Sequence, residues 1–264
     1  MELDLKSKNA VITGGTRGIG LAIAEGLARE GVNLAICARD KKVLDEAIVS
    51  IKNKYNVKAI GIVADVAKTK DIENFVSKVQ EFYGSIDILI NNAGMGSRER
   101  IMEASDEKWQ YYWDLHVMAA VRLSRTIVPL MKERKGGVII NVSSVAAKQP
   151  QWYEPIYNVT KIALVMLSNC LAKELVTENI RVNCVNPGYI LTPDWKRIAE
   201  ILGKETGITW EDYINGIAEK DIPLGRFASV EEVADFIVFL CSKRASYCVG
   251  STYYIDGGAL KVVT

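Results

Sequence analysis

The sequence is poor in the residues from which metal sites and disulfide frameworks are built. It has one histidine in 264 residues, and its five cysteines show no CxxC spacing. A zinc cage needs several such ligands at close spacing, so we expect no metal site. Most of the cysteines lie in apolar runs, where cysteine behaves as a small hydrophobic residue, and we expect all of them to be reduced. They are Cys37, Cys170, Cys184, Cys241 and Cys248.

The sequence also lacks concentrated charge and long apolar runs. Its 33 basic and 32 acidic residues give a formal net charge of +1. Neither sign forms a block, which argues against nucleic acid or a membrane surface as a partner. Charged residues interrupt every apolar run below membrane-spanning length, and the first residues lack a signal-peptide h-region. We expect a soluble, cytoplasmic protein whose partner is a small neutral or anionic metabolite.

Short β-branched runs alternate with amphipathic stretches along the whole chain. Near-continuous apolar strands joined by helical crossovers indicate a parallel sheet with helices on both faces. This is a doubly wound α/β fold of the Rossmann type. No linker or repeat interrupts it, so we expect residues 1–264 to form a single domain. The expected strands are residues 9–13, 32–38, 57–64, 87–91, 138–143, 180–186 and 252–255.

The segment from residue 189 to about residue 226 departs from this alternation. It carries Trp195, Trp210 and Tyr213 among charged residues. Ligands bind at the carboxyl ends of a parallel sheet, where a long insertion is usually functional. We interpret the segment as a substrate lid. A helical hairpin that only packs against a sister subunit is the alternative.

Tyr157 and Lys161 lie four residues apart in a helical pattern. Side chains at this spacing share a helix face, and a fixed cation stabilises a phenolate, lowering a pKa that is normally about 10. We therefore expect the pair to move a proton near neutral pH. Ser144 ends an expected strand thirteen residues before Tyr157. Tyr and Lys also meet at this spacing by chance, and serines often end strands.

A glycine-rich turn follows the first expected strand. Gly14, Gly18 and Gly20 suit positions where φ is positive or where the backbone approaches a pyrophosphate closely. The amphipathic helix that follows offers free N–H groups and its positive dipole end to an anion. Such a turn alone could be an ordinary βα connection. Its place between a strand and a helix favours a dinucleotide site.

Together these features resemble the classical short-chain dehydrogenase/reductase family. The resemblance rests on the TGxxxGxG spacing from residue 13, the Asn91-Asn92-Ala93-Gly94 element, the Ser144, Tyr157 and Lys161 set, and Pro187-Gly188, in the family's order over essentially the whole chain. It implies an NAD(P)-dependent oxidoreductase that transfers a hydride between nicotinamide and a secondary alcohol or ketone. Tyr157 would be the general acid or base, Lys161 would lower its pKa and hold the ribose, and Ser144 would polarise the carbonyl.

The resemblance also implies a set of cofactor contacts. They are Gly14, Thr16, Arg17, Gly18, Ile19, Gly20, Arg39, Asp65, Val66, Asn92, Ala93, Gly94, Tyr157, Lys161, Pro187, Gly188, Ile190 and Thr192. Asp65 would bind the adenine amine, although it could also be a plain helix N-cap. Ile190 and Thr192 would hold the nicotinamide carboxamide.

The choice between NAD and NADP depends on the end of the second strand. A carboxylate there would bind the ribose diol of NAD, but this chain has Ala38 followed by Arg39. Arg39 can donate two hydrogen bonds to a 2′-phosphate, so we expect NADP to be preferred. If Arg39 instead paired with Asp40, NAD would also be accepted.

His116 occupies a position at which the family usually carries an asparagine. That asparagine holds a water that links the lysine to solvent. Imidazole also donates and accepts hydrogen bonds, so we expect His116 to be a fourth catalytic residue that holds this water. A core histidine satisfied by the backbone is the alternative.

The segments that line the substrate pocket in the family carry aromatic, amide and charged residues here. We expect Ser144, Lys148, Trp152 and Tyr189 to contact substrate, which suits a hydroxylated or carboxylated molecule. The alternatives left open are a 3-oxoacyl-carrier-protein reductase, a sugar or polyol dehydrogenase, a hydroxy-acid dehydrogenase, and a dinucleotide-sensing binding protein without catalysis. The family commonly forms homotetramers, and we expect one here.

Overall fold

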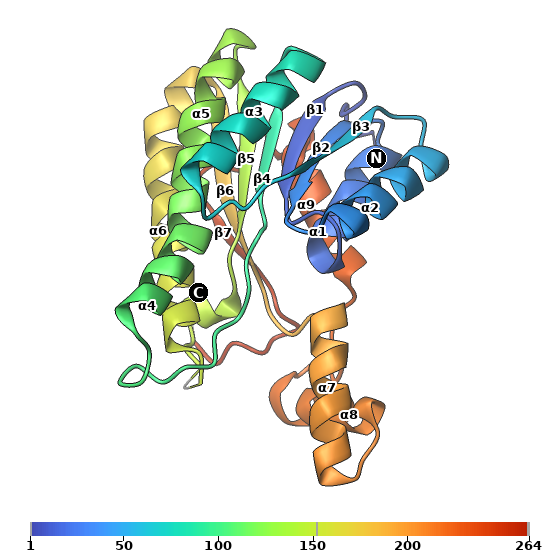
Figure 1. Ribbon diagram of the computed structural model, residues 1–264, viewed down its shortest axis with the longest axis vertical. Helices are drawn as coiled ribbons and strands as arrows, with labels where there is room; N and C mark the ends of the chain where they lie inside the picture. The colour runs from blue at the N-terminus through green and yellow to red at the C-terminus, as the bar shows by residue number, and fades with distance from the viewer. Residues whose placement is uncertain (1, 152, 263–264) are drawn as a thin grey trace.

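A computed structural model describes residues 2–151 and 153–262. Its strands form one parallel sheet in the order β3-β2-β1-β4-β5-β6-β7, as Figure 1 shows, which confirms the predicted doubly wound sheet. Each strand begins and ends within two residues of its expected range. The strands are β1 (Asn9–Thr13), β2 (Asn33–Ala38), β3 (Ala59–Val63), β4 (Ile88–Asn91), β5 (Gly137–Val142), β6 (Ile180–Pro187) and β7 (Thr252–Ile255).

Helices cover both faces of the sheet. Helices α1, α2 and α9 pack on one face, and α3, α5 and α6 pack on the other (Figure 1). The helices are α1 (Gly18–Arg29), α2 (Lys41–Lys54), α3 (Thr69–Tyr83), α4 (Asp106–Trp113), α5 (Ala119–Glu133), α6 (Pro155–Leu175), α7 (Pro193–Thr206), α8 (Trp210–Asp221) and α9 (Val230–Cys241). Three short 3₁₀ turns and one π-helical turn, Asp114–Met118 between α4 and α5, complete the described helical segments.

Strand β1 shows why these sequences form buried strands. Ile12 faces the cluster that contains Leu27 of α1, whereas Val11 faces the opposite cluster, which contains Phe75 of α3 and Ile127 of α5. Successive side chains point to opposite faces of a strand, so a strand covered on both faces has apolar residues at consecutive central positions, here residues 10–12. Consequently the strand appears in the sequence as a continuous apolar run.

The order of the strands creates a crevice between β1 and β4. From β1 the chain proceeds to the β2 side of the sheet, and from β4 it proceeds to the β5 side. The connections therefore diverge at this point, and ligands of doubly wound folds bind outside the carboxyl ends of the strands there. The turn that starts at Gly14 and the segment that starts at Asn92 form the two sides of this crevice.

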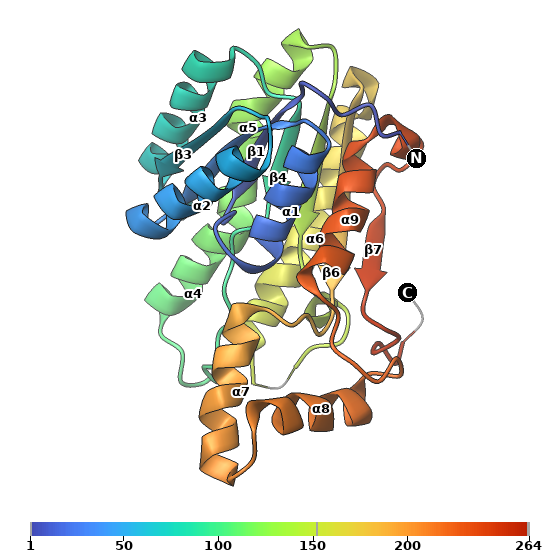
Figure 2. The same cartoon turned by 90° about the vertical axis from the view of Figure 1, so that its right-hand side faces the viewer.

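Helices α7 and α8 form a hairpin that projects beyond the carboxyl edge of the sheet (Figure 2). The hairpin has its own small apolar cluster, separate from the two cores of the sheet. This cluster consists of Ala199, Ile214, Ala218, Ile222 and Phe227, with partly buried aromatic residues around it. Among the described helices, none combines the length and the apolar character that crossing a membrane requires.

The glycine turn gives a stability prediction. A Cβ at Gly20 would overlap the carbonyl oxygen of Gly14, whereas a Cβ at the exposed Gly216 of α8 would meet no atom within 4 Å. We expect Gly20→Ala to lower the free energy of unfolding by about 1–3 kcal/mol through overpacking. Gly216→Ala should raise it by about 0.5–1 kcal/mol through helix propensity. Urea unfolding measures the free energy of unfolding of both variants. A Gly20→Ala variant with the wild-type free energy of unfolding would contradict the packing of this turn.

Candidate functional site

The glycine turn leaves the start of α1 open to an anion. Gly14 and Gly18 have positive φ values of 66° and 54°, which favour glycine. Arg17 occupies the N-cap of α1, and no side chain caps the helix there. The first N–H groups of α1 therefore point into the crevice without side-chain partners, beside half-buried Thr16 and Ile19. This is a suitable cradle for a pyrophosphate group.

Hydrogen bonds join the two sides of the crevice. The Thr13 hydroxyl accepts from the backbone N–H groups of Asn92 and Ala93, both at 3.0 Å. The Asn92 amide donates to the carbonyl oxygens of Thr13 at 3.0 Å and Gly14 at 3.2 Å. Asn92 therefore holds the glycine turn in place. Thr13 opens the TGxxxGxG motif, but the motif alone did not show that its hydroxyl joins the two sides of the crevice.

Arg39 lies on the outer side of the crevice. Its guanidinium donates to the hydroxyl of Tyr111 at 3.0 Å, while the Asp40 carboxylate accepts from the N–H of Val43 at 3.1 Å and so caps α2. The alternative in which Arg39 pairs with Asp40 is therefore wrong. Arg39 and Tyr111 border a hollow of about 370 Å³. A phosphate group placed there would be within reach of a guanidinium.

Asp65 and Val66 follow β3 farther along the same edge. The Asp65 carboxylate accepts from the N–H of Ala67 at 3.1 Å, and Val66 is buried. Because Lys68 is the N-cap of α3, the reading of Asp65 as a plain helix N-cap is wrong.

Ser144, Tyr157 and Lys161 meet at the carboxyl end of β5. Ser144 follows β5, and its hydroxyl is hydrogen-bonded to Tyr157. Helix α6 begins at Pro155, so Tyr157 lies in its first turn and Lys161 lies one turn later on the same face. The Lys161 ammonium is 5.3 Å from the centroid of the Tyr157 ring and donates to the Val142 carbonyl at 2.9 Å. The structure brings these three side chains together, as expected.

Burial sets the pKa values of this group. It raises the pKa of Tyr157 to about 12, and the hydrogen bond with Ser144 acts in the opposite direction with a smaller effect. Burial also lowers the pKa of Lys161 to about 8. The expected net lowering of the Tyr157 pKa is therefore wrong, because burial outweighs the hydrogen bond with Ser144. At neutral pH the phenol retains its proton and can act as an acid.

His116 is a buried linker with no free ring nitrogen. Its Nε2 accepts from the N–H of Met95 at 3.2 Å, so the proton must lie on Nδ1, which is 2.8 Å from the Thr160 hydroxyl. Thr160 in turn donates to the carbonyl of Tyr157 at 3.0 Å. Burial, and secondarily Lys161, lowers the pKa of His116 well below its ordinary value.

The structure gives each ring nitrogen of His116 a protein partner, which fits the alternative of a satisfied core histidine. The expected role of His116 as the holder of a water stays a prediction. His116 still contributes to the site, because it ties the segment after β4 to the turn of α6 that carries Tyr157. The helix is π-helical at this point, from Asp114 to Met118. Gly94 passes directly over the ring, since a Cβ there would lie 3.2 Å from Nε2.

The residues expected after β6 connect the site to the hairpin. Pro187 ends β6, and Gly188 passes so close to Asp256 that an added Cβ would lie 2.9 Å from its Cα. Ile190 forms a parallel bridge with Ala228. Thr192 caps α7 by accepting from the N–H of Trp195 at 3.2 Å. Arg17 forms an exposed ion pair of 3.6 Å with Asp194, so the start of α7 lies beside the glycine turn.

The residues expected to contact substrate lie in different surroundings. Lys148 is exposed, and Trp152 lies outside the described residues. The ring of Tyr189 packs against Trp195 and Phe227, with centroid distances of 6.0 and 5.4 Å, so this residue contributes to the hairpin cluster.

Sequence reasoning placed Ser97 and Glu154 only within the segments that line the substrate pocket in the family, and it gave neither residue a role of its own. Ser97 is buried and accepts from the N–H of Tyr157 at 3.2 Å, so it caps the first turn of α6. A lone serine in a loop gives no signal for this role. Glu154 is half-buried one turn before Tyr157. Its spacing from Tyr157 was visible in the sequence, but its burial was not.

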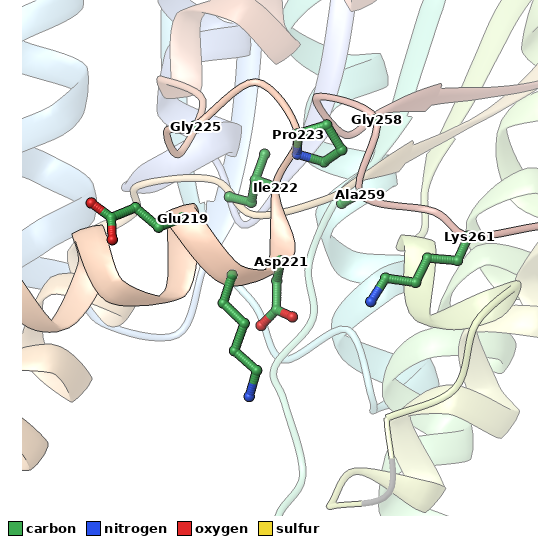
Figure 3. Close-up of a pocket in the computed structure, with 9 residues that line it drawn as sticks. Glu219, Asp221, Ile222, Pro223, Gly225, Gly258, Ala259 and Lys261 are labelled. Atoms are coloured by element: carbon green, nitrogen blue, oxygen red, sulfur yellow. The ribbon is translucent and has the colours of Figure 1, made fainter.

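A second hollow, of about 250 Å³, lies away from these residues, at the end of α8. Figure 3 shows Ile222 and Pro223 beside Gly258 and Ala259 of the segment after β7. The hollow contains none of the residues expected to act in catalysis. Within residues 2–151 and 153–262, no three His, Cys, Asp or Glu side chains are grouped to hold a metal ion.

Comparisons with known sequences show relatives over nearly the whole chain. A family model described as enoyl-(acyl carrier protein) reductase matches residues 14–259. Dehydrogenase/reductase SDR family member 4 of Oryctolagus cuniculus is 36% identical over 256 residues, which cover 97% of this chain and 94% of that protein. The 3-oxoacyl-acyl-carrier-protein reductase of Aquifex aeolicus is 33% identical over 258 residues, which cover 98% and 99% of the two chains.

Solved structures include similar chains bound to a dinucleotide. L-sorbose reductase from Gluconobacter frateurii, complexed with NADPH and L-sorbose, has a TM-score of 0.98 and 54% identity, with 100% of both chains covered. Actinorhodin polyketide ketoreductase, complexed with NADPH, has a TM-score of 0.91 and 29% identity, with 98% of this chain and 100% of that chain covered.

The neutral, buried state of His116 gives a prediction for stability as a function of pH. The unfolded chain takes up a proton at its only histidine below about pH 6.5, whereas the folded chain resists protonation there because its pKa is lowered. Stability should therefore fall as the pH falls below about 6.5, with a contribution from this residue of up to about 1.4 kcal/mol per pH unit. His116→Gln should remove this contribution.

Chemical unfolding of both proteins at half-unit steps from pH 5.5 to 8.5 measures the effect. The difference between their free energies of unfolding should be constant above about pH 7 and should shrink below about pH 6.5. A difference that stays constant over the whole range would show that His116 titrates normally in the folded protein.

Proposed function

The chain belongs to the classical short-chain dehydrogenase/reductase family of NAD(P)-dependent oxidoreductases, and on this premise we propose that it interconverts a sugar-sized ketone and its alcohol with NADPH as the reductant. The observation that carries the proposal is the convergence of Ser144, Tyr157 and Lys161 at the carboxyl end of β5. The likeness to a reductase solved with NADPH and L-sorbose supports the choice of cofactor and substrate class.

The residues of the site suit a dinucleotide. Gly14 and Gly20 allow the glycine turn to pack closely on itself and on the segment after β4, and the start of α1 offers N–H groups that no side chain caps. Arg39 is available for a 2′-phosphate, and no carboxylate occupies position 38 to favour NAD instead. In this proposal the residues of the crevice predicted from the sequence hold NADP.

The proposed mechanism assigns one step to each side chain. A nicotinamide held in the crevice would supply the hydride for the carbonyl carbon. Ser144 donates a hydrogen bond to the carbonyl oxygen as negative charge builds there. Tyr157 is protonated at neutral pH and transfers its phenolic proton to that oxygen. The Lys161 ammonium, 5.3 Å from the centroid of the ring, then stabilises the phenolate that remains.

His116 and Ser97 act as positioning residues in this scheme. Ser97 fixes the start of α6, and His116 fixes its first turn through Thr160. A phenol that must meet a substrate oxygen within hydrogen-bond distance needs such support. A dinucleotide sensor without catalysis would have no use for a buried acid beside a lysine.

The charges near the site argue against a substrate that is attached to a large acidic carrier protein. Lys108 forms an ion pair with Glu99 at 2.7 Å, and Arg122 forms one with Asp114 at 2.6 Å. Arg100 lies 4.0 Å from Glu103. Arg98 and Lys148 are exposed and form no ion pair within the described residues. Because the other three basic residues are already paired, the docking surface is weak, which favours a small free substrate over a 3-oxoacyl group on a carrier protein.

We further propose that residues 1–264 act as a single domain in which the segment 189–226 closes over the substrate. Its α7–α8 hairpin begins beside the glycine turn, and Trp195 in the first turn of α7 packs against Tyr189, which lies between β6 and α7. The hairpin cluster is small and separate from the two cores of the sheet, which suits a part of the molecule that moves on its own.

Homotetrameric assembly and a cytoplasmic location complete the proposal. Val159, Ile162 and Met166 form an exposed apolar stripe on α6, as an interface requires. Light scattering should give the mass of four copies, and Ile162→Lys should reduce the measured mass.

All five cysteines are free, which suits a reducing compartment. Recovery of the activity outside the cytoplasm on cell fractionation would contradict the location.

A substrate panel tests the proposed reaction. The protein should oxidise NADPH with ketoses such as L-sorbose and D-fructose, and reduce NADP with the matching polyols. Hydroxy acids and 3-oxoacyl thioesters should react at least about tenfold more slowly, judged by kcat/KM. The kcat/KM for NADPH should exceed that for NADH, and Arg39→Ala should reduce the ratio of the two values. Faster turnover of the thioesters would support the carrier-protein alternative, and dinucleotide binding without any turnover would support the sensor.

A further inference from the structure

Glu154 is a half-buried carboxylate one helical turn before Tyr157. It occupies the N-cap position of α6, yet its side chain makes no capping hydrogen bond. Ser97 fills that role instead, by accepting from the N–H of Tyr157 at 3.2 Å. The Glu154 carboxylate is therefore directed away from the helix end, at which a carboxylate would ordinarily be stabilised.

The carboxylate points toward Gly96, in the segment after β4. A Cβ at Gly96 would lie 2.7 Å from the Glu154 Oε1, so the carboxylate would have to shift if this residue carried a side chain. Tyr112, which packs nearby, donates its hydroxyl to the Gly96 carbonyl at 2.8 Å and is not free to bind Glu154. In the part of the chain that the structure describes, no residue donates a hydrogen bond to this carboxylate or forms an ion pair with it.

Glu154 is half-buried, so its carboxylate is partly desolvated, and its charge acts on the Tyr157 phenol. A ligand hydroxyl that donates to this carboxylate would offset the partial loss of water. The ionisable groups whose charges interact with Glu154 are Arg98 from the segment after β4, Tyr112 from α4, Tyr153, and Tyr157 from α6. Arg98 is the only cation among them, and it is exposed. Burial outweighs Arg98 and raises the pKa of Glu154 to about 7.

We propose that Glu154 determines the substrate class of the proposed reaction: its carboxylate accepts a hydrogen bond from a substrate hydroxyl close to the reacting carbonyl, and its charge disfavours substrates that carry a carboxylate there. The inference rests on the proposed function and deepens it. A carboxylate accepts hydrogen bonds strongly from hydroxyl groups and repels another anion at short range. The site therefore selects neutral polyhydroxylated molecules over hydroxy acids.

Three substrates and three variants test the proposal. The substrates are L-sorbose, 2,3-butanedione, which has no hydroxyl group, and acetoacetate, which carries a carboxylate. The variants are Glu154→Gln, Glu154→Ala, and Glu103→Gln as a matched control, since Glu103 is exposed and lies 4.0 Å from its cationic partner. We expect Glu154→Gln to lower kcat/KM for L-sorbose about tenfold to a hundredfold, and Glu154→Ala at least as much, because a charged acceptor is lost.

The other two substrates separate specificity from general damage. With Glu154→Gln, kcat/KM for 2,3-butanedione should stay within about twofold of the wild-type value. The ratio of kcat/KM for acetoacetate to kcat/KM for L-sorbose should rise. Glu103→Gln should behave as wild type with all three. Equal losses on all three substrates in Glu154→Gln would show a structural role and overturn the proposal, as would an unchanged kcat/KM for L-sorbose.

The pH dependence of KM gives an independent readout. As the pH falls through about 7 the Glu154 carboxylate takes up a proton, so KM for L-sorbose should rise in the wild-type protein and stay flat in Glu154→Gln. A flat wild-type profile would overturn the proposal. If the wild-type protein reduces no ketose, the proposed function fails and this inference fails with it. If it reduces ketoses and Glu154→Gln does so equally well, only this inference fails.

Discussion

The site depends on the burial of one turn of α6 against the end of β5. This turn carries a phenol and an ammonium group into the protein, where each would be destabilised without polar partners. Ser144 supplies a partner for Tyr157, and the Val142 carbonyl supplies one for Lys161. The two partners are separated by one residue at the end of the same strand, so the position of β5 in the sheet fixes the geometry of the whole group.

Several other features follow from keeping this turn in place. Ser97 caps the start of α6, and His116 holds its first turn through Thr160. The segment after β4 passes close to His116 at Gly94 and close to Glu154 at Gly96, because neither glycine has a Cβ. The same segment forms one side of the crevice and is joined to the glycine turn through Asn92 and Thr13. The surroundings of the phenol and the dinucleotide cradle are thus parts of one hydrogen-bonded unit.

The sequence predicted the fold well because the parallel sheet imposes a strong pattern. Strands such as β1 and β5 have continuous apolar centres since both faces are covered, and a glycine turn marks where α1 begins. The order of the motifs along the chain was enough to assemble Ser144, Tyr157 and Lys161. What the pattern could not give was the local environment. The pKa of Tyr157 depends on how completely the ring is buried, and the role of His116 depends on which groups face its two nitrogens. The position of the Glu154 carboxylate depends on a glycine that is distant in the sequence.

Replacement of Tyr157 by phenylalanine tests the central claim most directly. The variant keeps the ring but loses the proton donor, so NADPH should bind with a dissociation constant within a few-fold of the wild-type value, as measured by calorimetry. Ketose reduction at pH 7 should fall by about a hundredfold to ten thousandfold. Tyr247→Phe, which alters a fully exposed tyrosine, should leave both quantities unchanged. A Tyr157→Phe variant that binds NADPH and reduces the ketose at the wild-type rate would show that this phenol is not the acid, and the account given for the site would be wrong.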